Sequence, residues 1–163
     1  MTRRRLTVEQ WRDATLFFSG ELSRAGGKST EVDDPANLRR TVYSRVSRLK
    51  LNDLLMQFDY PDANVHAEKR AVTTTAIQKL FMLNSPFMMK RAAALAKQLT
   101  ADSNESDEAR VKNAYRKLFS RDANPHEVDL AVQFLSKPTT SSMSRWEQYA
   151  QVLLASDEML YVD

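Results

Sequence analysis

FDYPDANVHAEKRAVTTTAIQKLFMLNSP, residues 58–86, sets the organisation of the whole chain. It begins with a turn-rich polar bend and runs into a helix that ends near Asn84, where a second helix starts. Ser85 suits the N-cap of that second helix, and Pro86 suits its first turn, where an amide hydrogen has no helical partner. The segment therefore predicts a polar bend packed against two helices, and we expect any function to lie in this bend.

The polar side chains of the bend allow two roles. They can cap and turn the backbone through local hydrogen bonds, or their oxygens, together with His66 and Glu68, can bind a hard cation such as Ca²⁺. The EF-hand spacing and its glycine are absent, which favours the backbone role. In that role Arg70 pairs with Asp59 or Asp62 and locks the loop. The predicted binding or structural cluster comprises Asp59, Asp62, Asn64, Arg70, Thr74, Thr75, Gln78 and Asn84.

We predict no metal, no cofactor and no catalytic residues in this chain. The absence of cysteine excludes thiolate zinc sites, iron–sulfur clusters and a cysteine nucleophile. Three methionines, Met82, Met88 and Met89, could ligate haem or copper through their thioethers. No histidine or cysteine lies near them in the sequence, so core filling is the better interpretation. The sequence contains no HExxH, GxSxG or GxGxxG motif, and its two histidines, His66 and His126, are far apart.

Composition and periodicity predict a mainly α fold, a single-domain bundle of about six to seven helices over residues 1–163. The length suits one domain, and 42% hydrophobic with 28% charged residues is typical of a folded globular chain. Capping patterns mark three helix starts, because a side chain three residues after the cap can return a hydrogen bond. These pairs are Thr7 with Gln10, Asn124 with Glu127, and Ser144 with Glu147.

Two further segments carry specific expectations. Residues 39–48, RRTVYSRVSR, alternate apolar and polar side chains, which predicts a short extended or β segment near residues 40–47. In the helix that starts at Ala76, Ile77, Leu80, Phe81 and Asn84 share one face, which we expect to pack on the core.

The charge is uneven along the chain. Residues 1–50 hold eleven Lys/Arg against six Asp/Glu, whereas residues 101–163 hold seven against eleven. The basic half favours an anionic partner such as nucleic acid, lipid or acidic glycan, or the two halves simply attract each other. The hypothesis of nucleic-acid binding has less support, because the arginines are scattered along the sequence without a clear helix-turn-helix pattern. They are Arg3, Arg4, Arg5, Arg39, Arg40, Arg45 and Arg48.

Five ordered segments resemble a known family. They are SGELSRAGG (19–27), RRTVYSRVSR (39–48), FDYPDANVHAEKRAVTTTAIQKLFMLNSPF (58–87), FSRDANPHE (119–127) and SDEMLYVD (156–163). In this order they are similar to the planctomycete-specific C-terminal domain of unknown function, family 1553, of exported proteins with a cytochrome c-type haem domain. Departures from the family pattern are Ala76 in place of proline, Ala67 in place of cysteine, and Ser120 with Asp122 in place of a Gly-Arg-Pro run.

The resemblance implies a setting rather than a reaction. It implies an exported (periplasmic or cell-surface) multidomain parent of which this chain is the C-terminal part, with its redox chemistry in another domain. We expect a non-catalytic scaffold or interaction domain that contacts other domains of the parent or a protein partner. The alternatives are a glycan- or cation-binding module linked to extracellular polysaccharide handling, and a nucleic-acid-binding helical domain. The first alternative requires an open pocket with free carboxylates beside an aromatic such as Trp11, Tyr43 or Tyr60.

Overall fold

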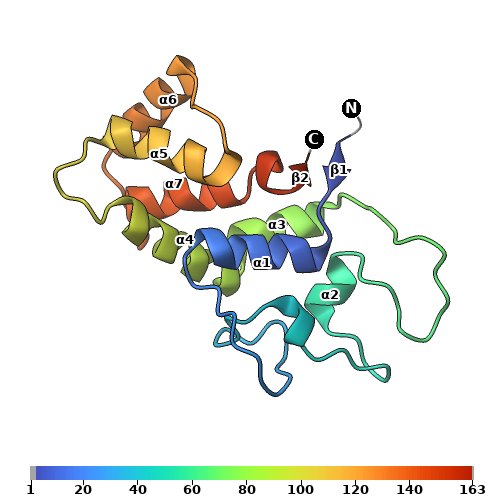
Figure 1. Cartoon of the computed structure of the whole chain (residues 1–163). Coiled ribbons are helices and arrows are strands. Elements are labelled where there is room, and N and C mark those ends of the chain that lie inside the picture. Colours follow the sequence, from blue (N-terminus) through green and yellow to red (C-terminus); the bar gives the residue numbers. More distant parts are fainter. Residues whose placement is uncertain (1–2, 163) are drawn as a thin grey trace.

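The computed structural model describes residues 3–162, which form a mainly α fold (Figure 1), as the sequence predicts. Two short 3-10 turns and a two-stranded antiparallel sheet accompany the helices in this range. The helices are α1 (Val8–Phe18), α2 (Asp53–Gln57), α3 (Ala76–Asn84), α4 (Pro86–Leu99), α5 (Asp107–Phe119), α6 (Pro125–Leu135) and α7 (Arg145–Leu154). The remaining elements are η1 (Thr41–Tyr43), η2 (Asp157–Met159), β1 (Arg4–Arg5) and β2 (Tyr161–Val162).

Side-chain caps fix where the helices begin. The three predicted capping boxes are present at α1, α6 and α7, and Ser85 caps α4 with Pro86 in its first turn. A fourth box joins Thr75 to Gln78 at the start of α3. Each box pairs two backbone amides that would otherwise lack a partner, so the sequence alone specifies these boundaries.

The core lies where α4 crosses the rest of the bundle. Helix α4 packs most extensively against α7. Ala92 of α4 and Ala150 of α7 are both fully buried, so the two helices approach closely. At the other side of the core, the Trp11 ring of α1 stacks on Phe58 with ring centres 4.9 Å apart. The bend that begins at Phe58 is thereby attached to α1.

The two ends of the described chain meet in the small sheet. Arg4 pairs with Val162 and Arg5 with Tyr161, and the Leu6 amide donates to the Leu160 carbonyl at 2.8 Å. Figure 1 shows β1 and β2 side by side at the edge of the bundle. Two-residue strands are too short to leave an alternating pattern, so this pairing could not be predicted from periodicity.

The strand predicted within residues 39–48 is replaced by η1, flanked by isolated bridges from Ser23 to Arg39 and from Thr30 to Ser44. Two side chains of α1 explain the difference. Arg12, fully buried, donates to three backbone carbonyls of the 32–39 loop, and Asp13 accepts from the Thr41 amide and hydroxyl, both at 2.7 Å. These contacts hold the segment as a turn rather than a regular strand.

Of the predicted apolar face of α3, Phe81 packs on the core, where its ring contacts those of Trp11 and Phe58, but the other members do not. The side chains of Ile77 and Leu80 are 66% and 55% exposed, whereas Gln78 and Met82 are buried. The helix is rotated because Gln78 is anchored in a polar cluster at its first turn. No helix in the described range is long and apolar enough to cross a membrane.

Candidate functional site

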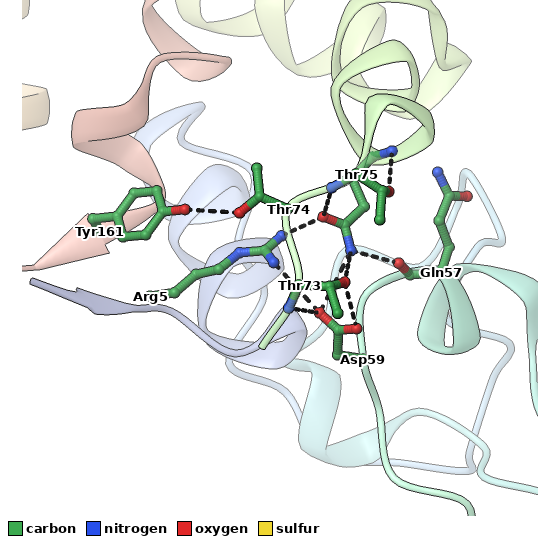
Figure 2. Close-up of polar contacts among 8 residues, drawn as sticks. Arg5, Gln57, Asp59, Thr73, Thr74, Thr75 and Tyr161 are labelled. Carbon is green, nitrogen blue, oxygen red and sulfur yellow. Dashed lines mark hydrogen bonds and ion pairs between the residues drawn. The ribbon is translucent and has the colours of Figure 1, made fainter. Parts of the chain in front are cut away.

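The candidate site is a polar cluster centred on Gln78, which is 1% exposed. Figure 2 shows how the other members, among them Arg5, Asp59 and Thr73, converge. The Oε1 of Gln78 accepts from Arg5 Nη2 at 2.9 Å and from the Thr75 amide at 3.2 Å. Its Nε2 donates to the Gln57 carbonyl at 2.8 Å and to Thr73 Oγ1 at 3.3 Å. One amide side chain therefore links β1, the end of α2 and the start of α3.

Asp59 forms the second centre of the cluster. Its φ of 61° is left-handed, a conformation that aspartate tolerates better than most residues. Its carboxylate accepts from the Thr73 amide at 2.9 Å, from Thr73 Oγ1 at 2.8 Å and from Arg5 Nη1 at 3.4 Å. The positive φ lets this side chain reach across to the residues that precede α3.

The C-terminal strand joins through a hydroxyl pair. Thr74 Oγ1 and the Tyr161 hydroxyl are 3.0 Å apart (Figure 2). Because Arg5 of β1 pairs with Tyr161 in the sheet, the cluster contacts both strands. The cluster therefore holds together four segments that are far apart in sequence.

The structure brings together only part of the predicted cluster. Asp59, Thr75 and Gln78 meet directly, and Thr74 joins through Tyr161. Asp62 and Asn64 are exposed and bond to each other, with Asn64 Nδ2 also donating to the Arg48 carbonyl at 2.6 Å. Asn84 is exposed at the far end of α3.

The predicted pairing of Arg70 is wrong. Arg70 forms hydrogen bonds with both carboxylate oxygens of Glu9, at 2.9 and 3.0 Å, and its guanidinium lies 5.2 Å from the Tyr60 ring centre. The ion-pair partner of Asp59 is Arg5, from the opposite end of the chain. Long-range partners of this kind leave no spacing in the sequence that identifies them.

Sequence reasoning missed four members of the cluster: Arg5, Gln57, Thr73 and Tyr161. The threonine run at residues 73–75 was a visible indication, since threonine side chains commonly bond to nearby backbone groups before a helix. Gln57 contributes a backbone carbonyl, which any residue would supply.

The polar groups of the cluster are bonded mainly to one another and to the backbone. The oxygens of Asp59 and Gln78 each accept hydrogen bonds from protein donors. Within residues 3–162, no group of three or more His, Cys, Asp or Glu side chains could hold a metal ion. The adjoining pocket, lined by Trp11, Phe58, Asp59 and Arg70 among others, is small, with a volume of about 50 Å³.

A second buried polar group lies on α1. The guanidinium of Arg12 bonds to the carbonyls of Val32 (3.1 Å), Arg39 (3.0 Å) and Asn37 (2.5 Å), and to Thr41 Oγ1 (3.2 Å). Burial lowers the pKa of Arg12 to about 10, so the side chain remains charged at neutral pH. This charge-assisted network fastens the loop that follows α1 to the helices.

Next to the polar cluster, α3 presents an apolar outer surface, which we define as Ile77, Leu80 and Leu83. Their spacing places all three on the solvent side of the helix, and Leu83 is 50% exposed. The nearest cation on the helix, Lys79, is engaged by Asp157 at 2.5 Å. The three side chains of the outer surface of α3 are thus apolar, and the neighbouring cation is paired.

No curated protein and no solved structure shows a significant match to this chain. A family model matches residues 1–135, which ends at the last residue of α6 and includes the whole polar cluster except Tyr161. On this match, the chain belongs to the family described as protein of unknown function (DUF1553).

Proposed function

We propose that this chain is a non-catalytic interaction domain that docks on a neighbouring domain of its own parent protein through the outer surface of α3. The observation that carries the proposal is the exposure of Ile77, Leu80 and Leu83 on a helix whose first turn is locked by the Gln78 cluster. Contiguous apolar surface of this kind marks interaction sites on folded proteins.

The locked first turn supports docking. A surface that is already rigid loses less conformational entropy on binding, so more of the contact energy appears as affinity. The centres of interfaces are also depleted of charged residues, as is the outer surface of α3. The polar cluster would thus act as the support of the interface and not as its contact surface.

The family resemblance supports this role, because it implies an exported multidomain parent. An exported protein with a haem domain elsewhere in its chain would use this domain to hold its parts together. The membership supplies no reaction for the domain, and the paired state of Asp59 offers none.

The glycan- or cation-binding alternative has less support. Asp59 is engaged by protein donors, Trp11 is buried in the core, and Tyr60 is engaged by Arg70. Calorimetric titration with Ca²⁺ and with an acidic glycan tests this alternative directly. Saturable heat from either, lost in Asp59→Asn, would favour the binding module over the scaffold.

A substitution in the centre of the α3 outer surface tests the docking proposal. We expect Leu80→Asp to weaken the association of the separately expressed domain with the remainder of the parent at least about tenfold, because a buried unpaired carboxylate is costly. Titration calorimetry measures the affinity. The matched control is Leu130→Asp, an equally exposed leucine on α6. Equal affinities for the two variants would contradict the proposal.

A further inference from the structure

A second exposed surface begins in η1 and continues into the connection between η1 and α2. Leu49 is 100% exposed, and Val42 is 69% exposed, with Val46 also on the surface. Figure 1 shows this connection running away from the helices at the lower edge of the view before it returns to α2. Three large aliphatic side chains within eight residues of an outlying loop cannot be explained by packing within this chain.

Cations are interleaved with these side chains. Residues 42–50 hold three Lys/Arg and no Asp/Glu. The nearby anion Glu31 is paired with Arg45 at 3.3 Å. Leu49 stands directly between two exposed cations, Arg48 and Lys50. The loop therefore combines an apolar tip with a net positive charge.

Two hydrogen bonds, at Arg45 and at Arg48, fix the shape of the loop on the N-terminal side of Leu49. The Arg45 amide donates to the Thr30 carbonyl at 2.8 Å, and Asn64 Nδ2 donates to the Arg48 carbonyl at 2.6 Å. Asn64, predicted as a site residue, thus holds this loop rather than the Gln78 cluster. A loop held at these points presents its tip without first having to order itself.

We propose that this loop binds the surface of an anionic lipid bilayer, with Leu49 and Val46 entering the boundary between headgroups and acyl chains. Arg48 and Lys50 would then lie at the level of the lipid phosphates, as long basic side chains do beside interfacial apolar residues. This attachment is peripheral and uses a surface separate from the outer surface of α3.

Two observations favour lipid over nucleic acid. Single-stranded nucleic acid is bound largely by stacking of bases on aromatic side chains, and the loop has one aromatic, Tyr43, among aliphatic neighbours. A fully exposed aliphatic residue such as Leu49 gains nothing from phosphates or bases, but it gains free energy when it leaves water for the acyl boundary.

Flotation of the chain with vesicles tests the proposal. We expect binding to phosphatidylcholine vesicles that contain phosphatidylglycerol, little binding to pure phosphatidylcholine, and loss of binding at high salt. Arg48→Gln with Lys50→Gln is expected to lower the partition coefficient about 25-fold, roughly fivefold per charge. Leu49→Ser is expected to lower it about tenfold.

Matched variants elsewhere on the surface control for charge and hydrophobicity. Lys90→Gln with Lys97→Gln removes two exposed cations of α4, and Leu130→Ser removes an exposed leucine of α6. Both should bind vesicles like the wild type, and circular dichroism should show every variant folded. The proposal is overturned if anionic vesicles are not bound, if loop and control variants behave alike, or if a single-stranded oligonucleotide competes the chain off the vesicles.

Discussion

Replacing Arg12 with methionine is expected to lower the free energy of unfolding by about 3–5 kcal/mol. Methionine fills a similar volume but donates no hydrogen bond, so the carbonyls of Val32, Asn37 and Arg39 lose their donor while they remain buried. Because these acceptors belong to the backbone, no side-chain repacking can remove them. Urea unfolding followed by tryptophan fluorescence measures the loss.

The same variant should act first on the loop after α1. Amide hydrogen exchange is expected to rise across residues 30–45 more than in α4 and α7, since the loop is held to α1 by Arg12 and Asp13. Arg12→Lys should also destabilise, because one ammonium group cannot meet four acceptors arranged for a planar guanidinium. Arg24→Met, at an exposed arginine, is the control and should change stability by less than about 0.5 kcal/mol.

Replacing Gln78 with leucine is expected to cost about 2–4 kcal/mol, the second largest effect. The change removes the acceptor of Arg5 and the donor to the Gln57 carbonyl, and it breaks the capping box of α3. For a chain of this length, the melting temperature should fall by roughly 5–15 °C. Calorimetry measures the melting temperature directly.

Gln78→Leu should also release the terminal strands. Faster amide exchange at Arg5 and Leu6 would show that β1 has been released, because the Arg5–Gln78 hydrogen bond connects β1 to α3. Gln133→Leu, at an exposed glutamine of α6, provides the matched control and should leave both readouts unchanged. A Gln78 variant as stable as this control would show that the cluster does not support the fold.

The helices and their starts could be predicted because the information is local. A capping box such as Ser144 with Glu147 depends on four consecutive residues, and its geometry does not depend on the rest of the fold. The mainly α class followed from these boundaries together with the apolar periodicity between them.

The orientation of α3 could not be predicted because it depends on distant partners. Ile77 and Leu80 have the spacing of a core face, yet the bonds of Gln78 to Arg5 and Gln57 turn a polar side chain inward. Likewise, nothing near Arg12 in the sequence identifies the carbonyls that it binds, which lie 20–27 residues away. Arg12, although it lies on an apolar helix face, holds residues 39–48 in a turn, whereas their alternating pattern predicts a strand.

The candidate site was predicted in outline and corrected in its members. Asp59, Thr75 and Gln78 do meet, because Thr75 and Gln78 share the capping box of α3 and Asp59, at the start of the bend, reaches across to Gln78. Asp62 and Asn64 belong instead to the exposed part of the bend, and Arg70 reaches Glu9 on α1. Which members of a polar segment turn inward depends on contacts with β1 and β2 that sequence spacing does not encode.

Hydroxyl-radical footprinting of the whole parent protein tests docking through α3 most directly. Oxidation of Ile77, Leu80 and Leu83 should be severalfold slower in the parent than in the isolated chain, while Leu130 and Val152, also exposed, serve as internal references. Slower oxidation confined to the α3 outer surface is the result that we predict. Equal oxidation of the three α3 side chains in the parent and in the isolated chain would contradict docking through this surface.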